Sequence, residues 1–155
     1  MHLLTFTLDG DRYALDAATV RLVERAVAIT PLPRAPALVE GVIDVHGTLA
    51  PVFDLRRRFG LAARELTADE HLIVASAGDR LVAFRVDEAL DLVAAPDDLA
   101  HVPPLAGGAA GEGVARLSDG AVAIYDLTTF LDASERATLD AALVSAREPG
   151  VATSG

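Results

Sequence analysis

The sequence predicts an all-β protein with one C-terminal helix, in which the strands form two small barrels of about five strands each. Short segments in which apolar and polar residues alternate are typical of half-buried strands. Turn sequences such as Asp9-Gly10 separate these segments. Two patterns also recur in the same order about 70 residues apart, which indicates two related halves.

The first predicted hairpin lies at the N-terminus. Apolar residues alternate with threonines over 4–8, Asp9-Gly10 supplies the turn, and a second strand over 13–15 leads to Asp16. A carboxylate such as that of Asp16 can accept hydrogen bonds from the free N–H groups of a following turn. We therefore expect residues 17–23 to begin helically and then to extend.

A proline-rich connector comes next. The prolines of residues 30–36 exclude a central strand, since each removes a backbone donor and restricts the residue before it. Residues 37–40 then suit one helical turn, which Gly41 would end.

The second hairpin pattern pairs residues 42–45 with residues 48–55 around His46-Gly47. Pro51 within it predicts an edge strand or a bulge, because proline cannot donate to a ladder. Residues 56–60 then suit a short helical turn.

Strand patterns resume in the second half of the chain. The polar stretch 63–70 is the best candidate for a linker. Strands are expected over 72–75 and 81–86, a loop rich in proline, glycine and alanine over 103–113, and a further hairpin turn at 118–120.

The C-terminal helix is predicted from the capping-box spacing of residues 132–135. Leu139 and Leu143 then lie on one side of a helix that runs to about residue 146. Residues 148–155 are expected to form a flexible tail.

The internal repeat has two parts. Gly10-Asp11-Arg12 recurs as Gly78-Asp79-Arg80, and the strand sequence over 51–55 recurs over 123–127. If each half forms a small barrel, the seam between the two barrels is the natural binding cleft.

Composition excludes several classes of enzyme. The 155 residues are 52% hydrophobic, carry a formal net charge of −10 and include no cysteine, which excludes thiol nucleophiles, thiolate zinc sites and iron–sulfur clusters. All 13 basic residues are arginines, which excludes a Schiff-base lysine. The acidic balance argues against nucleic acid and favours protein partners. Neither a signal peptide nor a long apolar segment is evident, so we expect a cytoplasmic protein.

The remaining motifs contain no catalytic or metal-binding arrangement. None of the four histidines has a metal-ligand neighbour at helical spacing, and no serine lies in a Gly-x-Ser-x-Gly sequence. The glycine-rich stretch 107–113 is better explained as a flexible loop than as a phosphate loop, and Asp97-Asp98 as the start of a turn. We expect no metal and no cofactor.

Three carboxylates, those of Asp16, Asp54 and Asp87, each end an apolar strand. They could act as acids or bases in a cleft. We prefer to interpret them as caps of the turns that follow, since capping explains every copy without a substrate. The arginines that begin at Arg56 could bind phosphate, but a solvated face or pairing with nearby carboxylates is the better interpretation.

Four segments of this sequence, in their order and spacing, resemble the CheW family of bacterial chemotaxis adaptors. They are Phe6-Thr7-Leu8 with residues 13–16, Pro36-Ala37 with residues 41–43, Gly47 with residues 51–56, and residues 81–87. The resemblance implies a single CheW-like domain over residues 1–147, made of two SH3-like barrels with an approximate linker at 63–70. It also implies a non-enzymatic adaptor that couples the histidine kinase CheA to the cytoplasmic tips of chemoreceptors.

The resemblance further implies a receptor-binding groove beside the seam between the barrels. By position, its residues here would be Val20, Leu22, Gly41, His46, Gly47 and Leu72. The CheW-like regulatory domain of the kinase would pack end to end against the second barrel. The protein would be recruited to receptor arrays at the inner face of the membrane without inserting into it, and it would bind no nucleic acid.

One departure from the family pattern concerns the groove. The family usually shows Asn-x-Arg-Gly where this chain has His46 in place of the arginine, and Leu22 stands where a glutamate typically pairs with that arginine. Losing both partners avoids an unpaired charge, which indicates a compensated change that affects receptor choice. Two alternatives stay open: an accessory CheW-like domain that binds a kinase without receptors, and a small-molecule-binding barrel that uses Asp16, Asp54 and Asp87.

Overall fold

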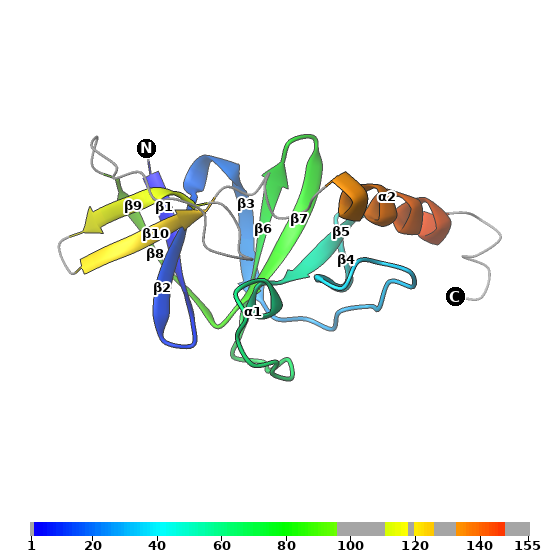
Figure 1. Cartoon of the computed structure of the whole chain (residues 1–155), viewed down its shortest axis with the longest axis horizontal. Coiled ribbons are helices and arrows are strands. Elements are labelled where there is room, and N and C mark those ends of the chain that lie inside the picture. The colour runs from blue at the N-terminus through cyan, green and yellow to red at the C-terminus, as the bar shows by residue number, and fades with distance from the viewer. Residues whose placement is uncertain (1, 96–110, 118–119, 126–132, 148–155) are drawn as a thin grey trace.

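The computed structural model describes residues 2–95, 111–117, 120–125 and 133–147 (Figure 1). In these ranges the chain is mostly β, with a C-terminal helix, as the sequence predicted. The elements are β1 (His2–Leu8), β2 (Asp11–Asp16), the 3-10 turn η1 (Ala17–Thr19), β3 (Val20–Arg25), β4 (Val39–Val45), β5 (Thr48–Asp54), α1 (Leu55–Arg58), β6 (His71–Ala77), β7 (Arg80–Val86), β8 (Glu88–Ala94), β9 (Gly111–Leu117), β10 (Gly120–Tyr125) and α2 (Ala133–Arg147).

The described strands form two five-stranded sheets that exchange hairpins. Sheet A has the order β8-β1-β2-β10-β9, and sheet B has the order β3-β6-β7-β5-β4. The two orders match strand by strand, because β3, β4 and β5 of sheet B correspond to β8, β9 and β10 of sheet A, and β6 and β7 correspond to β1 and β2. The internal repeat is therefore present, but each half of the chain lends its first hairpin to the sheet of the other half. The expectation that each half builds its own barrel is wrong, because β1 and β2 pair with β8 and β10.

Neither sheet closes into a complete barrel in the part of the chain that the structure describes, where no ladder joins β8 to β9 or β3 to β4. In sheet B the connector between β3 and β4 spans part of this opening. Thr30 and Val42 exchange two backbone hydrogen bonds, of 3.0 and 2.8 Å. The architecture is thus a pair of SH3-like barrels that remain open.

Strand register extends the repeat beyond the segments found in the sequence. Gly41 pairs with Val52 in sheet B, and Gly113 pairs with Ile124 in sheet A, each beside an irregularity in the ladder. The sequence Glu-Gly-Val occupies residues 40–42 and recurs 72 residues later. Of the predicted loop over 103–113, residues 111–113 belong to β9, and the rest lies outside the described residues.

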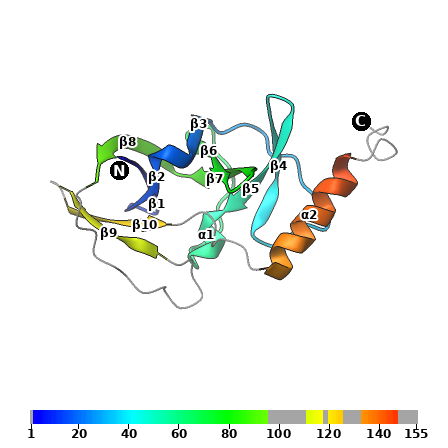
Figure 2. The same cartoon turned by 90° about the horizontal axis from the view of Figure 1, so that it is seen from above.

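The described apolar side chains form one large cluster and two small ones. The large cluster contains Phe6 of sheet A, Phe84 of sheet B and Leu139 of α2, so it holds the three parts together. One small cluster lies on β4 to β7 around Leu72, and the other lies within sheet A around Ile124. Figure 2 shows α2 beside β4, at the end of the molecule away from β9.

Two local predictions are corrected. The predicted helical turn over 37–40 is a single turn at 37–38, closed by a hydrogen bond of 2.9 Å from the backbone N–H of Val39 to the carbonyl oxygen of Pro36, and it goes no further because β4 already begins at Val39. Pro51 lies in β5, which is an interior strand between β7 and β4. Proline is tolerated there for two reasons. Val42, which lies opposite Pro51, forms its backbone N–H and C=O hydrogen bonds with Thr30, so it needs no donor from Pro51. On the other side, the parallel pairing of β5 with β7 starts only at Val52.

The chain passes between the sheets at two narrow points. Residues Ala17–Thr19 lead from β2 in sheet A to β3 in sheet B, and Asp87 alone separates β7 in sheet B from β8 in sheet A. The stretch 63–70, predicted as the approximate linker, connects α1 to β6 and so begins and ends beside sheet B.

Candidate functional site

The six residues predicted to form the groove all belong to strands or turns of sheet B, but they differ in accessibility. Val20 and Leu22 on β3 are half-buried, and His46 and Gly47 are exposed at the turn between β4 and β5. Gly41 and Leu72 are buried, and Leu72 lies in the cluster inside sheet B. Four of the six residues can therefore touch a partner, and two lie behind them.

Val20 and Leu22 face different parts of the core. The pairing of β3 with β6 shifts register between them, so that Val20 packs against the large cluster and Leu22 against the cluster inside sheet B. A bulge of this kind re-aims side chains along a strand. The two residues therefore do not line one continuous pocket.

Gly41 is required by the connector that crosses it. A Cβ atom at this position would lie 2.2 Å from the carbonyl oxygen of Thr30. That distance is far inside van der Waals contact, so any larger residue would displace the connector that bonds to Val42. Gly41 thus contributes to this surface by allowing the close approach of two backbones.

The β4–β5 turn holds His46 and Gly47 with positive φ angles of 50° and 88°. The backbone N–H of Gly47 donates to Oδ1 of Asp44 at 2.7 Å. Two consecutive residues with positive φ are typical of a type I′ hairpin turn, which the twist of paired strands favours. The turn presents the exposed imidazole of His46 at the tip of the hairpin.

Two of the three strand-end carboxylates are caps, as predicted. Asp16 accepts a hydrogen bond from the backbone N–H of Ala18 at the start of η1, and Asp54 accepts one from Arg57 at the start of α1. Asp87 is not a cap, so that prediction is wrong. The parallel ladders explain the difference, since Ala14 pairs with Ile124 and Ala83 pairs with the equivalent Val52. The repeat equivalent of Asp16 is therefore Arg85.

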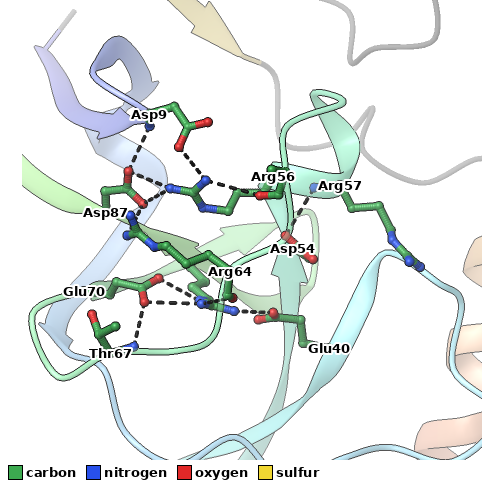
Figure 3. Close-up of polar contacts among 11 residues, drawn as sticks. Asp9, Glu40, Asp54, Arg56, Arg57, Arg64, Thr67, Glu70 and Asp87 are labelled. Carbon is green, nitrogen blue, oxygen red and sulfur yellow. Dashed lines mark hydrogen bonds and ion pairs between the residues drawn. The ribbon is translucent and has the colours of Figure 1, made fainter.

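Asp87 is instead the centre of an ion-pair cluster between the sheets (Figure 3). Nη2 of Arg56 donates to both of its carboxylate oxygens at 2.7 and 2.8 Å, and Arg64 donates to Oδ1 at 2.9 Å. Arg56 also binds Asp9 in the turn between β1 and β2, whose backbone N–H donates to Asp87. This cluster joins sheet A to sheet B, and it confirms for Arg56 the interpretation as a partner of carboxylates.

A second cluster surrounds Arg85 within sheet B, and its partners Glu40, Arg64 and Glu70 are labelled in Figure 3. Its guanidinium donates to Glu70 at 2.7 and 3.2 Å, to Glu40 at 2.6 Å, and to the carbonyl oxygen of Arg64 at 2.6 Å. Glu70 also accepts from the backbone N–H of Thr67. The stretch 63–70 is therefore fastened to β7 and to the bulge of β4.

The carboxylates of the two clusters differ in pKa. Burial by itself would raise the pKa of Asp87 and of Glu70, but hydrogen bonds from Arg56 and Arg85 hold both pKa values below their usual ranges. Burial raises the pKa of Glu40, and Arg85 opposes this rise only in part. All three guanidinium nitrogens of Arg85 and both Nη atoms of Arg56 have polar partners, which suits a structural role. Nε of Arg56 and Oε2 of Glu40 are buried and form no hydrogen bond within the described part of the chain.

The sequence prediction missed several exposed apolar residues and one buried ion pair. The larger exposed apolar side chains include Val23, Val27, Leu90 and Leu92. The apolar run within residues 89–95 was a usable indication of strand β8. For Arg85 and Glu70 the sequence offers only a lone cation in an apolar strand, with a partner 15 residues away.

The described residues contain no group of three histidine, aspartate or glutamate side chains able to hold a metal ion. They also contain no helix long and apolar enough to cross a membrane. Of the histidines, His71 accepts a hydrogen bond at Nδ1 from the backbone of Ala89. Asp97-Asp98 and most of the glycine-rich stretch lie outside the described residues.

Comparison with known proteins gives concordant matches. The model of the CheW-like domain matches residues 2–135. A chemotaxis protein CheW of Rhizobium meliloti is 28% identical over 86% of this chain and 89% of its own length, and one of Klebsiella aerogenes is 27% identical over 88% and 85%. The crystal structure of the scaffolding protein TtCheW from Thermoanaerobacter tengcongensis superposes with a TM-score of 0.78 at 27% identity, covering 86% of this chain and 94% of that one.

Proposed function

Because the chain belongs to the CheW-like domain family, we propose that it couples the histidine kinase CheA to the cytoplasmic tips of chemoreceptors in signalling arrays. Relatives that match most of its length are chemotaxis proteins, and a structural match is a scaffolding protein, so a chemotaxis scaffold is the supported role. The coupling of these two partners is the proposal. In this role the protein catalyses no reaction and is recruited from the cytoplasm to the arrays.

The observation that carries the proposal is that each sheet leaves apolar side chains accessible on an edge strand. In sheet A these are Leu90 and Leu92 on β8, and in sheet B they include the half-buried Val20 and Leu22 on β3. Exposed apolar patches on a soluble protein mark sites of protein contact. Two such surfaces on different sheets suit a protein that holds two partners together.

The receptor tip is assigned to sheet B. Amphipathic helices dock through apolar side chains against apolar protein surfaces. Val20, Leu22, His46 and Gly47 can make direct contact, since each is at least partly exposed. Gly41 and Leu72 are buried and act indirectly. Gly41 leaves room for the backbone of the connector at Thr30, and Leu72 packs in the cluster inside sheet B.

The regulatory domain of CheA is assigned to sheet A. That domain is itself CheW-like by the family resemblance, so two edge strands of the same type would meet. β8 carries Leu92, whose side chain is 65% exposed. Edge strands with exposed apolar side chains pair readily with a second sheet.

Leu22 and His46 together set receptor preference in this proposal. A receptor matched to a glutamate and an arginine would leave its own polar groups unpaired against leucine and histidine. We expect the chain to prefer its cognate receptors. Equal binding of the natural chain and of a Leu22→Glu/His46→Arg variant to both classes of receptor would contradict this preference.

Co-sedimentation with CheA and a receptor cytoplasmic fragment tests the proposed function. A ternary complex in which kinase activity rises supports the adaptor. Binding to CheA without receptor supports the accessory alternative and overturns the coupling role. Binding to neither partner overturns the assignment of both surfaces.

A further inference from the structure

We propose that Val23, Arg25 and Val27 form an additional receptor-contact stripe, and that this stripe selects an amphipathic helix carrying a carboxylate between two apolar positions. The inference rests on the proposed function and specifies the partner surface that the receptor must offer. None of these three residues belongs to the groove that the family resemblance implies.

The three side chains share one face because the chain stays extended through them. β3 ends at Arg25, where it pairs with His71, and the next backbone N–H, of Ala26, donates to the carbonyl oxygen of Glu70 at 2.9 Å. Alternate residues of an extended segment point to the same side. Val23, Arg25 and Val27 therefore form a line along one face of this segment. It is the face on which Ile73, directly opposite Val23, packs into the large cluster, and the stripe lies at the exposed edge of that face.

Exposure agrees with this alternation. Val23 is 40% exposed, Val27 is 46% exposed, and Arg25 is exposed between them. Leu22, on the opposite face of the strand, packs into the cluster inside sheet B. The stripe thus adjoins the predicted groove without being part of the core.

The dimensions and the charge of the stripe define its partner. The four steps from Val23 to Val27 in an extended chain span about 13 Å, which corresponds to about nine residues of a helix. A helix that lies along the stripe would place apolar residues against the two valines. Arg25 lies between them as a cation on a chain whose net charge is −10, so a partner carboxylate at that level would find a positive group rather than repulsion.

The experiment measures two binary affinities for the full-length chain, one for a receptor cytoplasmic fragment and one for CheA. Val27→Asp and Arg25→Glu are compared with Leu92→Asp, a matched change on β8, and with Arg25→Lys, which keeps the charge. We expect Val27→Asp and Arg25→Glu to weaken receptor binding about tenfold or more while CheA binding is unchanged. Arg25→Lys should bind nearly as the natural chain does, and Leu92→Asp should weaken only CheA binding.

The two failures are distinguishable. Natural receptor binding that survives both Val27→Asp and Arg25→Glu overturns the stripe but leaves the proposed function standing. Absence of receptor binding by the natural chain overturns the proposed function and the stripe with it. Thermal unfolding of each variant, compared with the natural chain, separates a lost contact from a lost fold. If Val27→Asp unfolds the protein, Arg25→Glu, at an exposed position, decides the result.

Discussion

Arg85 and Arg56 are both buried, but the ion pairs of Arg85 lie within sheet B, whereas those of Arg56 connect sheet B to sheet A. Arg85 binds Glu70, whose side chain is 2% exposed, whereas Arg56 binds Asp9, whose side chain is 39% exposed. A carboxylate at the surface can turn to water when its partner is lost, and a buried one cannot. Similar ion pairs therefore differ in energetic importance according to where their partner carboxylates lie.

The repeat sharpens this contrast. The equivalent of Arg85 in sheet A is Asp16, a half-buried residue that caps η1. One copy of the repeat thus uses this position for a buried cation, and the other uses it to turn the chain toward the second sheet. Equivalent strand positions therefore tolerate opposite charges when their surroundings differ.

Removal of Arg85 should have the largest effect. Arg85→Met would leave the carboxylates of Glu70 and Glu40 without their cation inside sheet B, so we expect the free energy of unfolding to fall by about 3–5 kcal/mol. Urea denaturation measures the loss. The triple variant Arg85→Met/Glu70→Gln/Glu40→Gln should recover part of it, and a loss below that of Arg56→Met would reverse the ranking of the two clusters.

Removal of Arg56 should cost less. Arg56→Met leaves Asp87 partly exposed and Asp9 free to face water, and we expect a loss of about 1–3 kcal/mol. Hydrogen exchange should rise at the β1–β2 turn and near Asp87, where the two sheets meet. Increased exchange confined to the interior of sheet B would contradict the assignment of Arg56 to the junction.

Acid should lower the stabilisation from the two clusters to different extents, and this difference should be smaller than the effect of removing either arginine. The pKa of Asp87 is lowered on folding, so its ion pairs stabilise the fold above its ordinary value of 3.8 and this stabilisation is lost as pH falls through the folded pKa. The pKa of Glu70 is lowered in the same way relative to 4.5, whereas that of Glu40 is raised, so protonation of Glu40 favours the fold as pH falls toward 4.5. The two shifts near Arg85 oppose each other.

We therefore expect Asp87→Asn to flatten the acid dependence of stability more than a joint Glu70→Gln/Glu40→Gln change does. Urea denaturation from about pH 6 to about pH 3 measures the slopes. Parallel curves for Asp87→Asn and the natural chain would show that the junction does not determine acid sensitivity.

The smallest effect is expected at Arg64, which touches both clusters. Its exposed guanidinium pairs with Asp87, and its carbonyl oxygen accepts from Arg85. Arg64→Ala removes only the exposed ion pair, so a loss of about 0–1 kcal/mol that declines with added salt is expected. A loss as large as that of Arg56→Met would mean that the side chain, rather than the backbone, links the clusters.

Much of the fold could be predicted from local patterns. Alternation and turn sequences identified the first hairpin, the hairpin around His46 and the C-terminal helix, because each depends on neighbours in the sequence. The exchange of hairpins could not be predicted, since β1 pairs with β8 across more than 80 residues and periodicity carries no information on such pairing. Strand β8 itself was missed.

The candidate site was predictable to a lesser extent. The family resemblance identified accessible positions at Leu22 and His46, but it could not show that Leu72 is buried. Spacing alone suggested that Asp87 resembles Asp16, and only strand register shows that the two positions differ. The exposure of Val23 on β3 depends on a bulge that no local pattern in the sequence indicates.

The exchanged hairpins have a consequence for synthesis on the ribosome. Sheet B can assemble once β7 has emerged, but β1 and β2 must wait for β8, β9 and β10 before sheet A is complete. During that interval the N-terminal hairpin keeps its edges unpaired, and such edges promote misassembly. Premature termination before β8 would therefore yield a chain in which sheet B is assembled but the β1–β2 hairpin lacks its partner strands. Such a chain would be a natural substrate for chaperones.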